Sequence, residues 1–264
     1  MADLPQPIDP SQIAENLGDV RDRIAGAALR SHRDAGLVTL VAVSKTQPVE
    51  AVQAAWEAGQ RVFGENRVQE ALEKMAPAPP EAQWHLVGHL QTNKARKVAG
   101  KFAMVHSLDS LELARELDKR QGAWVAAETP GPETSVLDVL VQLNWTGEET
   151  KSGIRSMAEM ADLMAVVRGC SHLRLRGLMT MPDPAFDERA TRLHFAHIRE
   201  LLVTVRNEFG LGKEFDQLSM GMTHDFEWAI EEGATIVRVG TAIFGQRRPR
   251  PPGTQPVPSQ EAMP

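Results

Sequence analysis

The stretch Leu37-Val38-Thr39-Leu40-Val41-Ala42-Val43-Ser44-Lys45, followed at once by Thr46-Gln47-Pro48, decides the fold that we predict. A continuous aliphatic run bounded by turn residues is typical of a strand that is covered on both faces of a parallel sheet. Lys45 then stands at the carboxyl end of the strand. In α/β barrels this end carries the chemistry, because the loops that follow the strands converge there.

Lys45 is therefore a candidate functional residue. A lysine amine that is partly removed from water has a lowered pKa and can form a Schiff base with an aldehyde. The alternative is an ordinary lysine whose ammonium group extends from a strand end into water. The strand alone does not decide between the two interpretations.

The rest of the chain alternates apolar runs with helical patterns. Strands are predicted at residues 37–45, 61–65, 83–88, 103–107, 136–143, 174–180, 216–220 and 235–239. Helices are predicted at 48–58, 66–75, 92–98, 110–120, 157–168, 187–209 and 223–232, with loops at 121–133 and 144–153 and a last helical turn after residue 240. Eight parallel strands with right-handed crossovers close most naturally into a barrel, so the predicted fold class is α/β, a (β/α)8 TIM barrel.

Two segments lie outside this alternation. Residues 11–32 predict an additional amino-terminal helix that packs against the barrel. Its apolar residues near helical spacing are Ile13, Leu17, Val20, Ile24 and Leu29. From residue 248 the chain is dense in proline and has no hydrophobic pattern, which predicts disorder. The predicted organisation is one barrel domain over residues 1–247 and a Pro-rich tail over 248–264.

Composition restricts the possible partners and the compartment. The net charge of -6 and the pI near 5.8 argue against a nucleic-acid surface, which needs clustered Lys and Arg. Cys170 is the only cysteine, which excludes an intrachain disulfide and fits a reducing cytoplasm. The amino terminus has no basic region leading into an apolar stretch, and no run is long enough to cross a bilayer. We therefore expect a cytoplasmic protein that binds neither nucleic acid nor membrane.

The ends of the last two predicted strands are suited to phosphate. Leu218-Ser219-Met220-Gly221-Met222 closes the seventh strand, and Arg238-Val239-Gly240-Thr241-Ala242 closes the eighth. Barrels often bind phosphate at these loops through backbone N–H groups. Small residues that make tight turns are the alternative interpretation. No metal site is expected, because His194 and His197 on the long predicted helix have no acidic or cysteine partner at a metal-site spacing.

Several blocks of the sequence occur in an order that is highly specific. They are Ala42-Val43-Ser44-Lys45-Thr46, Phe63-Gly64-Glu65-Asn66, Trp84-His85-Leu86-Val87-Gly88-His89-Leu90-Gln91-Thr92-Asn93-Lys94, Lys151-Ser152-Gly153, Gly177-Leu178-Met179-Thr180-Met181, Leu218-Ser219-Met220-Gly221-Met222 and Val237-Arg238-Val239-Gly240-Thr241-Ala242-Ile243-Phe244-Gly245. From about residue 11 to 247 the chain thereby resembles the pyridoxal phosphate homeostasis proteins, fold-type III relatives of the amino-terminal domain of alanine racemase.

The resemblance implies that pyridoxal 5'-phosphate is the cofactor and that Lys45 carries it as a Schiff base. The matched positions give seven cofactor-binding candidates: Lys45, Asn66, His85, Ser219, Arg238, Gly240 and Thr241. Ser219, Gly240 and Thr241 would hold the phosphate, and Arg238 would face the pyridine nitrogen. For Asn66 and His85, simple hydrogen bonding within loops is the alternative. One departure is Thr223, which stands where the family usually has a serine.

The function implied by the resemblance is that of a carrier without catalytic residues, which takes part in intracellular pyridoxal phosphate homeostasis and amino-acid balance. An arginine at the ring nitrogen cannot accept a proton, so the bound cofactor should be a poor electron sink. We expect a monomer whose recipients are apo-enzymes that depend on this cofactor. The alternative is an enzyme, an amino-acid racemase or decarboxylase that uses the same lysine; a weaker one is a phosphate-binding barrel enzyme without cofactor. Racemisation is not expected, because the racemase takes its second base from a tyrosine and this chain has none.

Overall fold

A closed barrel of eight parallel strands forms the centre of the computed structural model, which describes residues 8–131, 134–145 and 152–246. Each strand pairs with the next along the chain, and β8 pairs with β1. The strands are β1 (Thr39–Val43), β2 (Val62–Glu65), β3 (Gln83–Leu86), β4 (Met104–Leu108), β5 (Leu137–Gln142), β6 (Leu173–Met179), β7 (Gln217–Ser219) and β8 (Ile236–Val239). The predicted (β/α)8 TIM barrel is confirmed.

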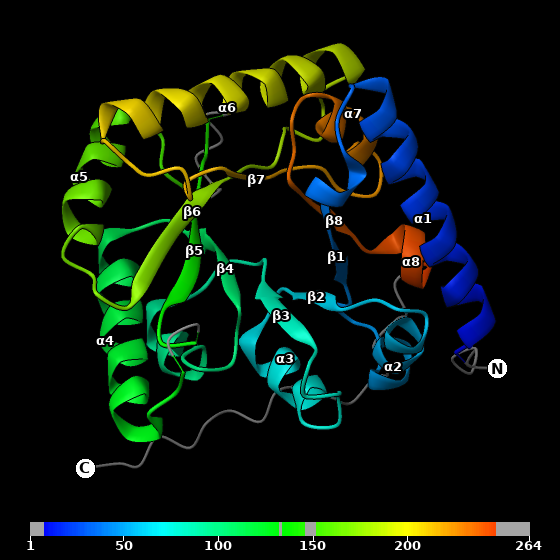
Figure 1. The fold of residues 1–264 in the computed structure, drawn as a ribbon, viewed down its shortest axis with the longest axis horizontal. Helices are drawn as coiled ribbons and strands as arrows, with labels where there is room; N and C mark the ends of the chain where they lie inside the picture. The colour runs from blue at the N-terminus through cyan, green and yellow to red at the C-terminus, as the bar shows by residue number, and fades with distance from the viewer. Residues whose placement is uncertain (1–7, 132–133, 146–151, 247–264) are drawn as a thin grey trace.

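Helices surround the barrel (Figure 1). The α-helices are α1 (Pro10–Arg30), α2 (Val49–Glu57), α3 (Val68–Met75), α4 (Leu111–Glu128), α5 (Met157–Val167), α6 (Glu188–Glu208), α7 (Phe226–Glu231) and α8 (Thr241–Phe244). Two short 3-10 helices are η1 (Ala35–Leu37) and η2 (Thr92–Lys97). The additional helix α1 packs outside the barrel against α2, α7 and α8, as its apolar stripe predicted.

Strand side chains divide between two apolar clusters. The larger one contains residues of strands and helices, Ala42 among them, and lies between the barrel and its surrounding helices. The smaller one is built on strand residues alone and fills the barrel interior: Val41, Val43, Met104, Leu140, Met179 and Ile236. Successive side chains on a strand point to opposite faces. The smaller cluster therefore identifies strand positions that point into the barrel, and the larger one identifies those that point toward the helices.

The predicted strand over residues 37–45 is too long at both ends. Ladder pairing of β1 runs only from Thr39, opposite Ile236 of β8, to Val43, opposite Gly64 of β2. Leu37 belongs to η1 and is exposed. Lys45 follows the strand in a turn. Apolar character alone overestimates a strand, since pairing with the neighbouring strands sets its ends.

The predicted loop over residues 121–133 is wrong at its start, because α4 continues to Glu128. The loop prediction depends on the glycines and prolines of this segment, but the first of them, Gly122, lies inside the helix. A Cβ at this position would lie 2.8 Å from Cε1 of His172. The glycine therefore permits close packing against the segment before β6.

Smaller differences concern helix ends and one face. The predicted helix over 223–232 begins only at Phe226, and the one over 92–98 is a 3-10 helix. Leu29 is predicted on the apolar stripe of α1 but is 76% exposed, because it lies five positions after Ile24 and the helix turns Ala27 and Ala28 inward instead.

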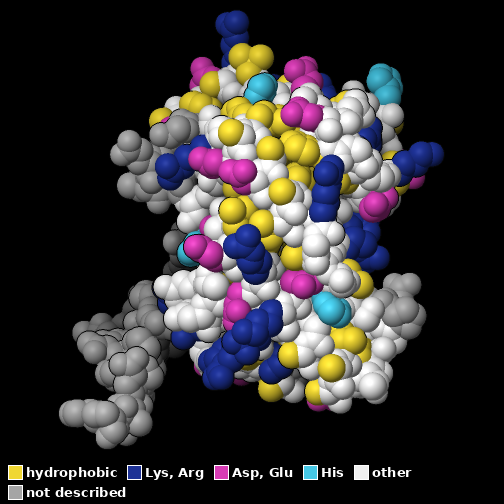
Figure 2. Space-filling model, turned by 90° about the vertical axis from the view of Figure 1, so that its left-hand side faces the viewer, with side chains coloured by type: hydrophobic (Ala, Val, Ile, Leu, Met, Phe, Trp, Pro, Cys, Tyr) yellow, Lys and Arg dark blue, Asp and Glu magenta, His cyan; other side chains and the backbone are white. Residues whose placement is uncertain are grey.

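No helix in the described part of the chain is both long and apolar enough to cross a membrane. The predicted tail over 248–264 lies outside the described residues, as does Lys151. Figure 2 shows a face on which Lys and Arg side chains lie among Asp, Glu and hydrophobic side chains.

Candidate functional site

Polar side chains fill the barrel interior above the apolar layer. His106 and Arg238 each follow a residue of the interior cluster by two positions, Met104 on β4 and Ile236 on β8, so they point into the same space. His85 on β3 and Ser219 on β7 join them there through hydrogen bonds. This polar layer lies toward the carboxyl ends of the strands, where barrel sites are found.

The polar layer is one continuous hydrogen-bonded chain. His85 Nδ1 lies 3.0 Å from His106 Nε2, and His106 Nδ1 lies 2.8 Å from Ser219 Oγ. Arg238 donates from Nη1 to Ser219 Oγ at 2.5 Å and from Nη2 to the backbone oxygen of Thr180 at 2.9 Å. These hydrogen bonds fix the guanidinium of Arg238 in the barrel interior.

Burial determines the charges in this layer. It lowers the pKa of His85 to about 4, and together with the charges of His85 and Arg238 it lowers the pKa of His106 well below the usual value. Both imidazoles are therefore neutral at neutral pH. Burial also lowers the pKa of Arg238 to about 10, against the opposing effect of Asp225, so the guanidinium remains charged. Among the described residues, Arg238 forms no recorded ion pair and its hydrogen-bond acceptors are neutral.

Lys45 lies at the same end of the barrel, in the turn after β1 and half-buried. Val41 and Val43 point into the interior, and Ser44 points outward to Glu65, with 2.6 Å between Ser44 Oγ and Glu65 Oε1. Lys45 is the next residue, and continuing the alternation of β1 into the turn predicts the inner side for its side chain. Val41 pairs with Arg238 across the ladder, so the Lys45 turn lies four residues beyond the level of Arg238, toward the carboxyl end of the barrel.

The loops after β7 and β8 meet at this end of the barrel. Gly240 N–H donates to Thr223 Oγ1 at 3.4 Å. A Cβ at Gly240 would lie 3.1 Å from the backbone oxygen of Val43, so glycine lets this loop approach the end of β1. Thr241 begins α8 and is exposed. This cradle joins the ends of β1, β7 and β8.

Ser219 and Thr223 differ in what their hydroxyls contact. Ser219 is buried in the barrel interior and serves Arg238 and His106, whereas Thr223 lies beside the backbone of Gly240. Thr223 is thus a site residue that the sequence reasoning did not select. Its signal was its position, since it replaces the family's serine in the loop after the seventh strand.

Asn66 directly follows β2 at the same end of the barrel and is half-buried. Its backbone packs so closely against Gly88 that a Cβ on the glycine would lie 2.3 Å from the Asn66 oxygen. All seven predicted residues therefore lie within the last two residues of a strand or on the loop that follows a strand. His106 was not predicted, although it links His85 to Ser219.

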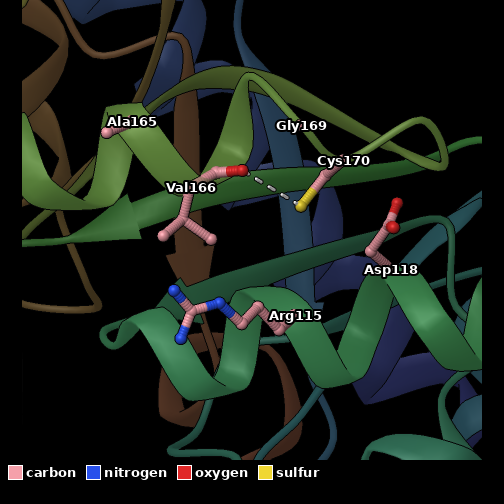
Figure 3. Close-up of a pocket in the computed structure, with 6 residues that line it drawn as sticks. All are labelled: Arg115, Asp118, Ala165, Val166, Gly169 and Cys170. Atoms are coloured by element: carbon pink, nitrogen blue, oxygen red, sulfur yellow. Dashed lines mark hydrogen bonds between the residues drawn. The ribbon is translucent and has the colours of Figure 1, made fainter.

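A cavity of about 510 Å³ lies outside the barrel between α4 and α5 (Figure 3). Its lining contains none of the predicted site residues and consists of Arg115, Asp118, Ala165, Val166, Gly169 and Cys170. The Cys170 Sγ lies 3.6 Å from the backbone oxygen of Val166, and burial raises the pKa of the thiol. A protonated thiol is a poor nucleophile, so this cavity does not provide a reactive site. Within the described ranges, no three His, Cys, Asp or Glu side chains are arranged to hold a metal ion.

Comparison with known proteins gives consistent matches over almost the whole chain. The family described as "Alanine racemase, N-terminal domain" matches residues 8–248. The pyridoxal phosphate homeostasis proteins of Pseudomonas aeruginosa and Escherichia coli K12 are 44% and 42% identical to this chain, over 238 and 241 residues. These alignments cover 90% of this chain and 96% and 97% of those proteins.

Solved structures show the same relationship. PipY of Synechococcus elongatus PCC7942, determined with PLP bound, aligns with a TM-score of 0.72 and 35% identity over 88% of this chain and 100% of PipY. An alanine racemase from Bacillus anthracis with bound L-Ala-P aligns with a TM-score of 0.63 over 90% of this chain and 57% of the racemase. At 16% identity, the likeness to the racemase shows the fold alone.

Proposed function

The chain belongs to the alanine racemase N-terminal domain family, among its pyridoxal phosphate homeostasis proteins, and from this premise we propose that it carries pyridoxal 5'-phosphate on Lys45 and takes part in homeostasis of that cofactor. The relatives' name and the PLP-bound structure of PipY support the cofactor. The geometry of this chain's own residues supports the site.

The observation that carries the proposal is the buried guanidinium of Arg238 beneath the Lys45 turn and the Thr223–Gly240 cradle. A buried cation whose recorded acceptors are neutral can donate to one further acceptor, and a pyridine nitrogen is such an acceptor. The cradle supplies backbone N–H groups and hydroxyls suited to a phosphate. An amine, a phosphate cradle and a ring donor together fit the three functional groups of pyridoxal 5'-phosphate.

Each residue has a defined task in this proposal. Lys45 would hold the cofactor covalently, because its amine can condense with an aldehyde and release water. Thr223, Gly240 and Thr241 hold the phosphate. Arg238 donates to the ring nitrogen, and Ser219 keeps the guanidinium in place.

The remaining candidates have supporting tasks. His85 acts through His106, which holds the Ser219 hydroxyl. Asn66 directly follows β2, at the same end of the barrel as the other candidates. Ser219 could bind the phosphate directly only if its hydroxyl left Arg238 or His106, so we assign the direct phosphate contact to Thr223.

We propose a carrier and not a catalyst, because Arg238 can donate a hydrogen bond to the ring nitrogen but not a proton to stabilise a carbanion. The sequence contains no tyrosine that could act as a second base. The proposed recipients are apo-enzymes that depend on pyridoxal 5'-phosphate. The proposed state is a monomer in the cytoplasm, where the single half-buried Cys170 remains reduced.

The test is chemical trapping. The purified full-length protein is mixed with pyridoxal 5'-phosphate, reduced with borohydride and digested, and the modified peptide is identified by mass spectrometry. We expect the cofactor mass on Lys45 and no turnover of amino acids by the loaded protein. A label on a different lysine contradicts the site, and turnover at an enzyme-like rate that requires Lys45 contradicts the carrier function.

A further inference from the structure

A buried ion cluster lies on the outer side of the barrel, directly behind the Lys45 turn. Lys74 on α3 donates to Glu65 Oε1 at 2.7 Å and to Glu70 Oε1 at 3.0 Å. The ammonium is only 7% exposed and Glu65 is fully buried. We call Glu65, Glu70 and Lys74 the Lys74 cluster.

The Lys74 cluster binds the two backbone groups that flank Lys45. The backbone oxygen of Ser44 accepts from Lys74 Nζ at 2.7 Å, and the backbone N–H of Thr46 donates to Glu70 Oε1 at 2.5 Å. One carboxylate and one ammonium, four residues apart on α3, therefore hold the peptide groups on both sides of Lys45.

The conformation that these bonds hold is an unusual one. Thr46 has a φ of 63°, in the left-handed region that β-branched residues rarely adopt. Such a conformation persists only where the surrounding contacts enforce it. The bond from the Thr46 N–H to the Glu70 carboxylate is charge-assisted and supplies such a contact.

Stability alone does not explain the cluster. Buried ion pairs often stabilise a protein no more than well-packed apolar side chains of the same volume. Apolar side chains, however, cannot bind the Ser44 oxygen or the Thr46 N–H. The property that only the ionic cluster supplies is a fixed backbone at position 45.

From this geometry we propose that Glu70 and Lys74 are positioning residues for Lys45. They fix the backbone of the turn so that the amine meets the carbonyl carbon of its aldehyde ligand. The proposal rests on the proposed function, since it assigns Lys45 as the attacking amine. It predicts that Glu70 affects covalent attachment and leaves the phosphate and ring contacts intact, because those contacts come from Arg238 on β8 and from the loops after β7 and β8.

The experiment compares Glu70→Ala with Glu73→Ala in the full-length protein. Glu73 lies on the same helix, is exposed and contacts only Gln69 in the recorded bonds, so it is a matched control. Two quantities are measured for each protein. The first is the rate at which borohydride-reducible label appears on Lys45 after addition of pyridoxal 5'-phosphate. The second is the affinity for pyridoxamine 5'-phosphate, which has no aldehyde and reports on the rest of the site.

For Glu70→Ala we expect the labelling rate to fall at least about 10-fold, since a displacement of about 1 Å at a reacting group can cost about 100-fold. The affinity for pyridoxamine 5'-phosphate should stay within twofold of the wild type. Glu70→Gln keeps an acceptor for the Thr46 N–H and should recover part of the rate; it also carries the test should the alanine variant not fold.

Three results would overturn the proposal. In the first, Glu70→Ala and Glu70→Gln label Lys45 as fast as Glu73→Ala. In the second, labelling and pyridoxamine 5'-phosphate affinity fall together, which would make Glu70 a general structural residue. In the third, wild-type protein binds pyridoxamine 5'-phosphate but never becomes labelled at Lys45, and then the proposed function fails as well.

Discussion

Replacing Lys74 with Met should strongly destabilise the protein while the volume of the side chain is nearly retained. The change removes the ammonium that neutralises Glu65, a carboxylate with no exposed surface. Its Oε1 atom would keep only the Ser44 hydroxyl, and its Oε2 atom is buried without a partner among the described residues. Removing one member of a buried pair costs about 3–5 kcal/mol. For a domain of this size that free energy lowers Tm by about 6–20 °C.

The loss should depend on pH in a defined direction. Burial raises the pKa of Glu65 above its usual value even though Lys74 opposes the shift. A carboxyl with a raised folded-state pKa contributes stability that is present below its unfolded pKa of about 4.3 and is lost as pH rises through the folded value. Without Lys74 the folded pKa rises further, so the penalty should shrink as pH falls from about 7 to about 5 and Glu65 takes up a proton.

Urea unfolding of Lys74→Met at both pH values measures this effect, with Lys101→Met as the control at an exposed lysine. The second change Glu65→Gln, in the Lys74→Met background, should recover part of the stability at neutral pH, because it removes the buried charge. A loss below about 1 kcal/mol, the range of exposed ion pairs, would refute the reasoning. So would a loss that grows on acidification.

Three further predictions concern the cofactor site. Lys45→Ala should abolish covalent labelling and leave the fold intact, as mass spectrometry after borohydride reduction and thermal unfolding will show; a label that persists on Lys94 would make the assignment wrong. Thr223→Val should weaken binding of pyridoxal 5'-phosphate by about 1–3 kcal/mol, which is about 5- to 150-fold in Kd, because it removes the hydroxyl that donates a hydrogen bond to the anionic phosphate. Ser219→Ala should also weaken it by releasing Arg238. A titration in which Thr223→Val matches the wild type would remove the phosphate from this cradle, and one in which Ser219→Ala matches it would contradict the task assigned to Arg238. The loaded protein should not exchange the α-proton of L-alanine in deuterated water, as followed by NMR; exchange at an enzyme-like rate that is lost in Lys45→Ala would contradict the carrier function.

The barrel could be predicted because its signals are local. Each apolar run and each helical pattern is read within about ten residues, and their alternation determines the topology. The errors arose where a distant contact overrides the local signal. Gly122 continues α4 because His172 lies against it, and β1 ends at Val43 because its neighbours stop pairing there.

The site was predictable only in part for the same reason. The strand end made Lys45 a candidate, and the small residues after the seventh and eighth strands indicated a phosphate site. The resemblance supplied the role of Lys45 and those of the individual residues in these loops. The contact of His106 with Ser219 joins residues 113 positions apart, and that of Lys74 with the Ser44 oxygen joins residues 30 apart. Contacts between residues so far apart leave no periodic pattern in the sequence from which they could be predicted. The buried support of a site is visible only once the strands are closed.

Alternation along β1 explains how the site and its support can share one strand end. Ser44 points outward to the Lys74 cluster, and Lys45, the next residue, takes the inner side. The ionic groups that hold the backbone therefore lie behind the sheet, separated from the interior by the strand itself. On the inner side the hydrogen-bonded layer contains the buried cation Arg238, whose hydrogen-bond acceptors, Ser219 and the Thr180 backbone, are neutral. An anionic ligand thus meets a positive interior, while the carboxylates that fix Lys45 remain outside it. Moving the Lys74 cluster to the inner face would place Glu65 and Glu70 beside the phosphate and repel it, so the one-residue alternation is what makes the rigid turn compatible with an anionic cofactor.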